Sequence, residues 1–455
     1  MTKKGRKVLF FWAVAFFVLL SSAVLIFAFG FKYDFENHVL AKTGSIVLNP
    51  NTEAEIFIDG QAEGVSASLL SNIFSKKRLL PGKYAVQIKK ENHFSWQKEV
   101  EVEEGLVSDF SKIVLFKHNQ DERVFANGQN SLSVSREAQK AVYWEEGIIS
   151  FYDLGNSQPI YQNNAFSFDT VSLKIIWGLN GKEAIVYDKS QTIYFDLAKK
   201  TFRELGSSKP YSLENSVLQN GQLYTLKLSF KKGAGGDLSA YSIENSTSKT
   251  IAKNLLSFLI VKNELFALTL SEKEVNLLKM GLGGENGQVL ADFSASKTLA
   301  EKVIKKIENR DGVYYALLGQ NLYSLKNSEA FLISKNAGGF AVSPDNTMLG
   351  WHHNREFWVW WIKDTEYQPM KKAGETELIA KVSKNIKGFD WYKNNGYVIL
   401  ELEDGLTAVE IDWRGGANDY AVLNLAGRER AWYDLNQNKI YKLNGENGLV
   451  IIDAP

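Results

Sequence analysis

The residues that could perform catalysis or bind a metal ion are few in this chain of 455 residues. Adjacent residues of a strand point to opposite faces, so His352 and His353 cannot bind one metal ion together. The chain has three other histidines, His38, His93 and His118, and no cysteine. It contains no His-Glu-x-x-His, Gly-x-Ser-x-Gly or phosphate-loop pattern. We therefore predict no catalytic residue, no metal site and no cofactor.

Paired carboxylates are the remaining candidates for enzyme chemistry. Glycosidases place two carboxyl groups on either side of the bond that they hydrolyse. The side chains available for such a pair are Glu145, Glu146, Asp390, Glu401, Glu403 and Asp404. Charged residues are also expected in ordinary turns, so an envelope polysaccharide or peptidoglycan hydrolase or lyase is the alternative function rather than the favoured one.

An aromatic cluster is the most suggestive feature for binding. It consists of Trp351, Phe357, Trp358, Trp360 and Trp361. Since Trp360 and Trp361 are consecutive, they point to opposite sides of a strand and at least one could lie on an open surface. Exposed aromatic side chains stack on sugar rings or anchor protein partners. We take these five as candidate partner-binding residues, although packing between neighbouring sheets is the interpretation that we favour.

An uncharged segment at residues 8–30 follows the cations Lys3, Lys4, Arg6 and Lys7. As a helix it spans roughly 35 Å, enough to cross a hydrocarbon core of about 30 Å. The positive-inside rule places residues 1–7 in the cytoplasm and the rest of the chain outside. A cleaved signal sequence is the alternative, but its apolar core has only about 7–15 residues. We therefore expect a single-pass signal-anchor in the cell membrane.

Composition favours an antiparallel β protein. No disulfide is available to a chain without cysteine, so a large core must supply the stability, and 11 Trp, 19 Tyr and 27 Phe provide apolar area for it. The 53 Lys and Arg nearly balance the 52 Asp and Glu, which gives no electrostatic reason to expect nucleic-acid binding. Many Asn-Gly and Asp-Gly turns indicate hairpins.

Two units are predicted between the helix and residue 117. Residues 31–43 read as a short polar stalk. Residues 44–117 contain short alternating strands, such as Ala54–Ile58, which ends at the hairpin signal Asp59-Gly60. Five or six such strands predict a small β-sandwich.

The sandwich segment resembles a PEGA domain. The matching residues are Gly44–Val47, Pro50, Ala54–Gly60, Gly64, Leu80–Tyr84 and His93–Trp96. The chain departs from the family pattern at residues 65–67 and has an insertion at residues 68–77. The resemblance implies a bacterial envelope protein in which this domain acts as a spacer or binding module.

Residues 118–455 contain a repeat, which is typical of a β-propeller. The second strands of the repeats are centred on Val142, Ile185, Leu223, Leu265, Tyr314, Leu349, Val398 and Ile440. Their mean spacing is about 43 residues, as in a four-stranded blade. The last repeat has three strands, and residues 122–126 could supply its fourth and close the ring. We favour eight blades, with seven as the alternative.

One turn adds a resemblance to known propellers. Residues 343–346, with the sequence Ser-Pro-Asp-Asn, resemble the corresponding turn of WD-like and TolB-type propellers. We therefore expect a membrane-anchored extracytoplasmic scaffold, mainly β, whose propeller binds an envelope protein or a cell-wall glycan while the sandwich acts as a spacer. A sensor or assembly factor for a membrane complex is a further alternative.

Overall fold

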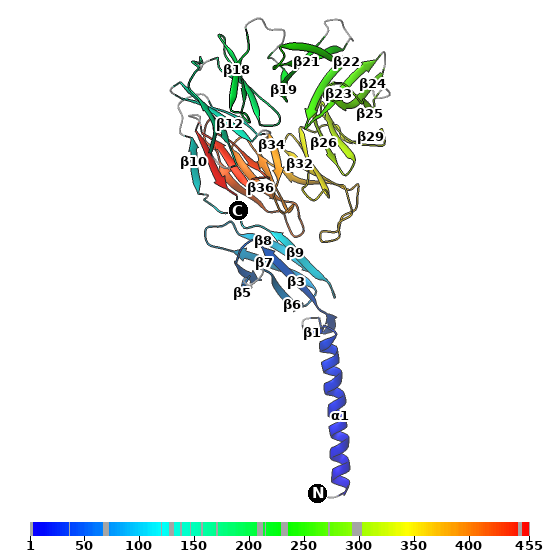
Figure 1. The fold of residues 1–455 in the computed structure, drawn as a ribbon. Helices are drawn as coiled ribbons and strands as arrows, with labels where there is room; N and C mark the ends of the chain where they lie inside the picture. Colours follow the sequence, from blue (N-terminus) through cyan, green and yellow to red (C-terminus); the bar gives the residue numbers. More distant parts are fainter. Residues whose placement is uncertain are drawn as a thin grey trace.

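The fold is mainly β, as the sequence pattern predicts. A long helix, a small β-sandwich and a ring of β-sheets follow one another along the chain (Figure 1). The computed structural model describes residues 3–35, 37–66, 72–119, 121–126, 132–136, 139–145, 147–155, 158–169, 172–206, 213, 215–228, 235–271, 274–293, 303–444 and 448–454.

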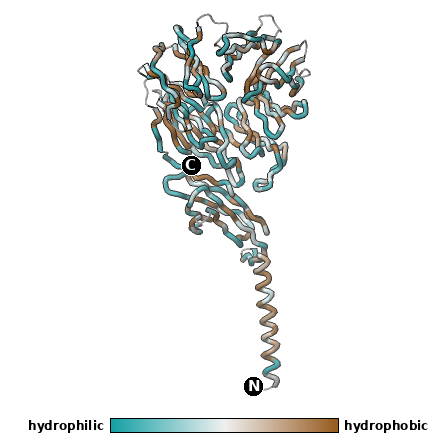
Figure 2. The backbone as a smooth tube through the Cα atoms, in the orientation of Figure 1, coloured by the Kyte–Doolittle hydropathy of each residue, from teal (hydrophilic) through white to brown (hydrophobic). Residues whose placement is uncertain are grey.

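Helix α1 (Lys3–Ala28) extends away from the rest of the molecule (Figure 1). Its segment Gly5–Ala28 is unburied and is long and apolar enough to cross a membrane. The hydropathy colouring of Figure 2 shows the helix as the longest continuous apolar segment in view. A membrane anchor and an N-terminal signal sequence share these properties, so the helix fits both interpretations of the sequence.

A β-hairpin follows the helix where the sequence pattern predicts a polar stalk. Its strands are β1 (Phe31–Asp34) and β2 (Val39–Lys42). Gly30 ends the helix with a φ of 80°, a conformation that glycine adopts without strain. Thr43 donates two hydrogen bonds to the Gly30 carbonyl, from its backbone nitrogen at 2.8 Å and its Oγ1 at 2.6 Å. The end of the helix is thereby fixed to the start of the sandwich.

The sandwich consists of two sheets with strand orders β6-β3-β9 and β5-β4-β7-β8. Its strands are β3 (Gly44–Pro50), β4 (Glu55–Ile58), β5 (Gln61–Val65), β6 (Phe74–Leu79), β7 (Gly82–Lys89), β8 (Trp96–Val102) and β9 (Val107–Ile113). Burial alternates along β3 and β8, which places one face of each sheet in a core. The core includes Ile46, Leu48, Ile56, Val86, Ile88 and Trp96.

The ring consists of four-stranded blades. Blade one contains β11 (Leu132–Ser135), β12 (Lys140–Glu145), β13 (Ile148–Asp153) and β14 (Gln158–Asn163), and blade two contains β15 (Lys174–Trp177), β16 (Glu183–Tyr187), β17 (Thr192–Asp196) and β18 (Thr201–Glu204). Blade five contains β26 (Ile304–Arg310), β27 (Val313–Leu318), β28 (Asn321–Lys326) and β29 (Glu329–Ser334), and blade six contains β30 (Gly339–Val342), β31 (Met348–His353), β32 (Glu356–Trp361) and β33 (Thr376–Lys381). Blade seven contains β34 (Gly388–Trp391), β35 (Tyr397–Glu401), β36 (Gly405–Glu410) and β37 (Asp419–Asn424).

Blades three and four share one long strand and form a single seven-stranded sheet. The strands are β19 (Ser216–Gln219), β20 (Gln222–Lys227), β21 (Gly236–Ser242), β22 (Thr247–Val261), β23 (Glu264–Ser271), β24 (Glu274–Gly281) and β25 (Gln288–Asp292). The first half of β22 pairs with β21 and the second half pairs with β23. Since β22 serves as the last strand of one blade and the first of the next, the described strands make eight blades.

The ring is closed by a strand that precedes the first blade. Blade eight has the order β10-β40-β39-β38, with β10 (Glu122–Ala126), β38 (Arg430–Asp434), β39 (Lys439–Leu443) and β40 (Leu449–Asp453). This is the position that the sequence pattern predicts for residues 122–126. Tyr441 of blade eight donates a hydrogen bond to the Leu154 carbonyl of blade one at 3.3 Å, and both residues share a buried cluster. The strand that precedes blade one thus completes blade eight and joins the first and last parts of the ring.

Candidate partner-binding site

The structure places three residues of the aromatic cluster between blades, where no partner can reach them. Trp361 and Phe357 pack between blades six and seven, with exposed fractions of 2% and 0%. Trp351 packs between blades five and six with 4% exposure. The sequence offered these three residues as candidates for partner binding, and the structure corrects this. Both faces of a blade are covered by its neighbours, so the three side chains are not accessible to a partner.

The other two aromatic residues of the cluster are partly exposed but also pack against rings. The Trp358 ring stacks on that of Trp351, with centroids 6.2 Å apart and an interplanar angle of 12°. The Trp360 ring stacks on that of Phe331 at 6.4 Å and 24°. Trp358 therefore packs on its cross-strand neighbour within blade six, whereas Trp360 packs on a ring of blade five.

Four of the candidate carboxylates lie in blade seven, and two of these are paired with cations. Glu401 accepts hydrogen bonds from both terminal nitrogens of Arg136, which lies just after β11. Glu403 forms an exposed ion pair with Lys387 at 2.8 Å. Glu145 and Asp404 lie exposed at the end of β12 and in a turn, while Glu146 lies outside the described residues.

Among the candidate carboxylates that the structure describes, Asp390 is the one with a strongly shifted pKa. It lies in β34, the innermost strand of blade seven. Burial raises its pKa to about 6, although hydrogen bonds from the backbone nitrogens of Trp391 and Leu435 and the charge of Lys306 act in the opposite direction. Its charged form is therefore a cost to stability at neutral pH.

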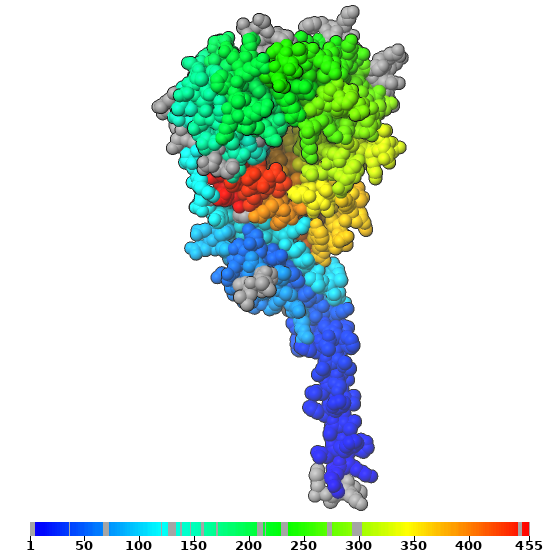
Figure 3. Space-filling model, viewed as in Figure 1, coloured from blue at the N-terminus to red at the C-terminus, as the bar shows by residue number. Residues whose placement is uncertain are grey.

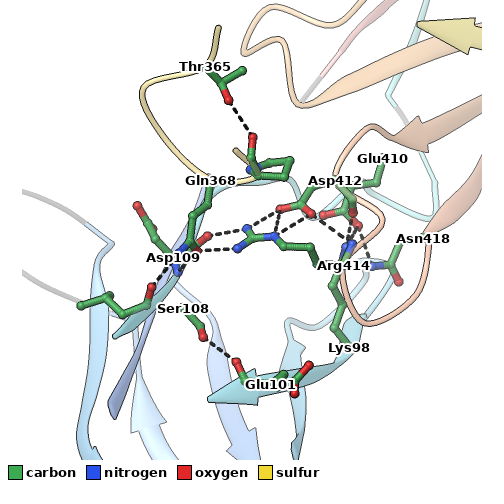
Figure 4. A network of polar contacts seen from close by, with 12 residues as sticks. Lys98, Glu101, Ser108, Asp109, Thr365, Gln368, Glu410, Asp412, Arg414 and Asn418 are labelled. Carbon is green, nitrogen blue, oxygen red and sulfur yellow. Dashed lines mark hydrogen bonds and ion pairs between the residues drawn. The ribbon is translucent and has the colours of Figure 1, made fainter. Parts of the chain in front are cut away.

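A different set of residues joins the sandwich to blades six and seven. In the space-filling view of Figure 3 the sandwich lies directly against this part of the ring. Lys98 of β8 forms an ion pair with Glu410 of β36 at 3.2 Å, and their side chains are 0% and 5% exposed. Trp96 donates a hydrogen bond to one oxygen of Glu410 at 3.2 Å. Asn418 donates one to the other oxygen at 2.8 Å (Figure 4). The carboxylate is thus held by three donors from both domains.

Gln368 and Arg414 form a second part of the same junction. Gln368, from the connection between β32 and β33, accepts a hydrogen bond from the Asp109 nitrogen and donates one to the Val107 carbonyl, each at 2.9 Å. Its amide therefore covers the free edge of β9 as a neighbouring strand would. Arg414 donates to the Asp109 carbonyl at 2.6 Å and pairs with Asp412 (Figure 4).

Aromatic rings complete the junction. The segment that leads from β9 to β10 carries Phe116, whose ring lies 5.5, 5.4 and 5.7 Å from those of Tyr392, Tyr397 and Tyr420 in blade seven. Phe94 of the sandwich lies 5.5 Å from Tyr420. Burial raises the pKa of Tyr397 well above its usual value. Sandwich and propeller therefore form one continuous packed body.

An open groove runs along this junction, with apolar side chains supplied by both domains. Leu106 and Val107 of the sandwich are 53% and 47% exposed, and Met370 and Trp413 of the propeller are 67% and 49% exposed. The groove holds ≈ 1250 Å³ of space open to solvent. Its charged residues are Lys83, Glu99, Glu101, Glu103, Lys371 and Arg414. Exposed apolar residues with a charged rim are typical of a protein-binding surface.

A much smaller pocket adjoins the groove. Phe110, Gln368 and Pro369 line both spaces. Tyr367, which is 41% exposed, lines the smaller one. Sequence reasoning did not find this site, because its residues come from distant segments. The one local signal is Trp413, a large aromatic residue in a polar, glycine-rich turn.

Comparisons with known proteins give only the fold. No protein-family model and no curated protein matches the chain. The WD40 domain of SCAP from fission yeast is 10% identical, with a TM-score of 0.41, and the match covers 73% of this chain and 98% of that one. The N-terminal domain of Nup159 is 12% identical, with a TM-score of 0.34 over 71% and 89% of the two chains. A protein from Lactobacillus plantarum is 12% identical, with a TM-score of 0.32 over 51% and 82%.

The cost of the buried Asp390 charge can be tested by substitution. We expect Asp390→Asn to stabilise the protein at pH 7 by up to about 3 kcal/mol, because the carboxyl pKa is about 6 in the folded state against 3.8 in the unfolded chain. Wild-type stability falls as pH rises through this window, so the gain should vanish below about pH 4, where both states bind the proton. Urea unfolding at both pH values measures the difference. The exposed Asp404→Asn serves as control, and a gain that is equal at both pH values would contradict the prediction.

The junction ion pair can be tested by removing one or both charges. We expect Lys98→Met to cost about 3–5 kcal/mol, because it leaves Glu410 buried and unpaired. Adding Glu410→Gln should recover more than half of the loss, since no charge is then left unpaired. The amide oxygen still accepts from Trp96, and a flip of the Asn418 amide lets its oxygen accept from the new NH2 group. Urea unfolding followed by tryptophan fluorescence measures both variants. As control, Lys83→Met breaks an exposed pair with Glu99 and should leave the midpoint nearly unchanged. If the double variant recovered no stability, the cost of Lys98→Met would not come from an unpaired Glu410 charge, and the prediction would be wrong.

Proposed function

We propose that this protein is a membrane-anchored scaffold that binds a protein of the bacterial envelope in the groove between sandwich and propeller. The observation that carries the proposal is the convergence of Leu106, Val107, Met370 and Trp413 from two domains on one groove. The propeller fold, which suits protein-interaction scaffolds, agrees with it. The bacterial and envelope assignment rests on the resemblance of the sandwich to PEGA domains.

A retained membrane anchor is the favoured role of α1. The uncharged part of the helix, residues 8–28, is well beyond the length of about 7–15 residues that the apolar core of a signal sequence has. The cations that precede it favour a cytoplasmic N-terminus, so that sandwich and propeller lie outside the membrane. The sandwich, rigidly joined to blades six and seven, then acts as a spacer that sets the height and direction of the propeller.

The groove chemistry favours a polypeptide over a cell-wall glycan. Leu106, Val107 and Met370 are aliphatic or thioether side chains that suit apolar side chains of a partner, whereas sugar rings stack on aromatic planes. Trp413 supplies one such plane and serves equally well as an apolar anchor. Since both walls belong to one packed body, binding does not require the free energy that would be needed to order them.

A non-catalytic role is the favoured one. Hydrolysis by paired carboxylates requires one carboxyl that can donate a proton and a second that is free to act as base or nucleophile. The raised pKa of Asp390 suits a proton donor. Its neighbours in blade seven, Glu401 and Glu403, are not free to act as the second group, because they are ion-paired with Arg136 and Lys387.

Site-specific photo-crosslinking in intact cells tests this function. A benzophenone amino acid at Met370 or Leu106 should crosslink a discrete protein, whereas the same group at Val289, an exposed residue of blade four, should not. Adding Trp413→Ala to the Met370 probe should reduce the yield about tenfold or more, as expected when one interface anchor is lost. Equal yields at Val289, or a heterogeneous glycan adduct in place of a protein, would contradict the proposal.

A further inference from the structure

The lower edge of the sandwich lies close to the end of the membrane-spanning segment. The guanidinium carbon of Arg78, in β6, lies 3.4 Å from the centre of the Phe27 ring, in the last turn of α1. Thr43 is hydrogen-bonded to Gly30, which directly follows the end of the same helix. These contacts fix the β1–β2 hairpin and β6 beside the point where the helix leaves its apolar segment.

The hairpin exposes apolar side chains at this level. Tyr33, Phe35, Val39 and Leu40 are 43%, 79%, 50% and 48% exposed. The Tyr33 and Phe35 rings contact each other edge to face at 5.0 Å, so they form one apolar protrusion. The folded chain offers these four residues little cover. Aromatic residues in such a position are typical of the membrane–water interface.

Cations outnumber anions in the sequence of the hairpin and β6, where Asp34 and Glu36 are the two acids. Lys32 and Lys42 flank it in its two strands, and Lys77 and Arg78 lie in β6, all with exposed side chains. Lys76 is paired with Glu63 and so contributes less. Aromatic rings beside cations match an anionic bilayer, whose surface attracts Lys and Arg while the interface accepts rings.

We propose that the β1–β2 hairpin and β6 form a contact surface for anionic phospholipids. In this arrangement Tyr33 and Phe35 lie at the level of the head groups and Lys32, Lys77 and Arg78 contact lipid phosphates. The inference rests on the proposed function, because it requires α1 to span the membrane. Its consequence is that the sandwich is held against the bilayer at more than one point, which restricts how the propeller can tilt.

The absence of cysteine from the chain allows a direct test with single nitroxide labels. The full-length protein in nanodiscs of phosphatidylcholine with phosphatidylglycerol would carry a label at Leu19→Cys in α1, Phe35→Cys in the hairpin or Val289→Cys in blade four. Collision with oxygen and with a water-soluble nickel complex reports the depth of each label. We expect the label at residue 19 to lie in the hydrocarbon core and the label at residue 35 to lie at the level of the head groups. The label at residue 289 should be exposed to water.

A charge variant separates the contribution of the cations. Lys77→Gln with Arg78→Gln should lower the ratio of docked to undocked hairpin about 30-fold, at roughly 1 kcal/mol per cation. The matched change Lys335→Gln with Lys384→Gln, on exposed positions of the propeller, should leave the Phe35 depth unchanged.

The outcomes distinguish the inference from the function on which it rests. A Phe35 label as accessible to the nickel complex as the Val289 label, with Leu19 buried, would overturn the lipid contact and leave the anchor intact. Water exposure at Leu19 would overturn both. Equal Phe35 depth in the two charge variants would overturn the role of Lys77 and Arg78.

Discussion

The buried pair of Lys98 and Glu410 fixes how the two outer domains meet. Removing two charges from water is costly, and their attraction compensates only where the geometry is good and the remaining polar atoms are satisfied. Here Trp96 and Asn418 donate to the two carboxylate oxygens, so a small displacement would leave a charge without its partners. The groove depends on this pair, because its walls come from both domains and exist only in this position.

Packed contacts run without interruption from the helix to the groove. Arg78 and Thr43 join α1 to the sandwich, and Phe116 in the connecting segment is buried among tyrosines of blade seven. The chain then continues into β10, which closes the ring. A rotation of the helix would therefore be transmitted to the whole body instead of being absorbed in a flexible linker. This property suits a scaffold that must present one face in a constant direction.

The repeat and the closing strand were predictable from the sequence because both depend on local patterns. Each blade repeats a short apolar strand at nearly constant spacing, and β10 fills a gap that the incomplete last repeat reveals. The junction was not predictable, since Trp96 and Glu410 lie 314 residues apart and Lys98 reads as an ordinary strand charge. Trp351, Phe357 and Trp361 stayed candidates for partner binding for a related reason, although packing between sheets was the favoured interpretation. A propeller blade is covered on both faces, so alternation along its strands cannot separate exposed from buried aromatic residues.

A partner bound in the groove would contact both domains, and this links binding to the stability of the junction. A ligand that binds only the docked arrangement stabilises that arrangement by mass action. By the same linkage, loosening the junction lowers affinity even when every residue that contacts the partner is unchanged. The buried ion pair and the apolar groove therefore act on one equilibrium, although they share no residue. Such coupling distinguishes a composite site from a patch on a single domain, where affinity depends on the contacts of that domain alone.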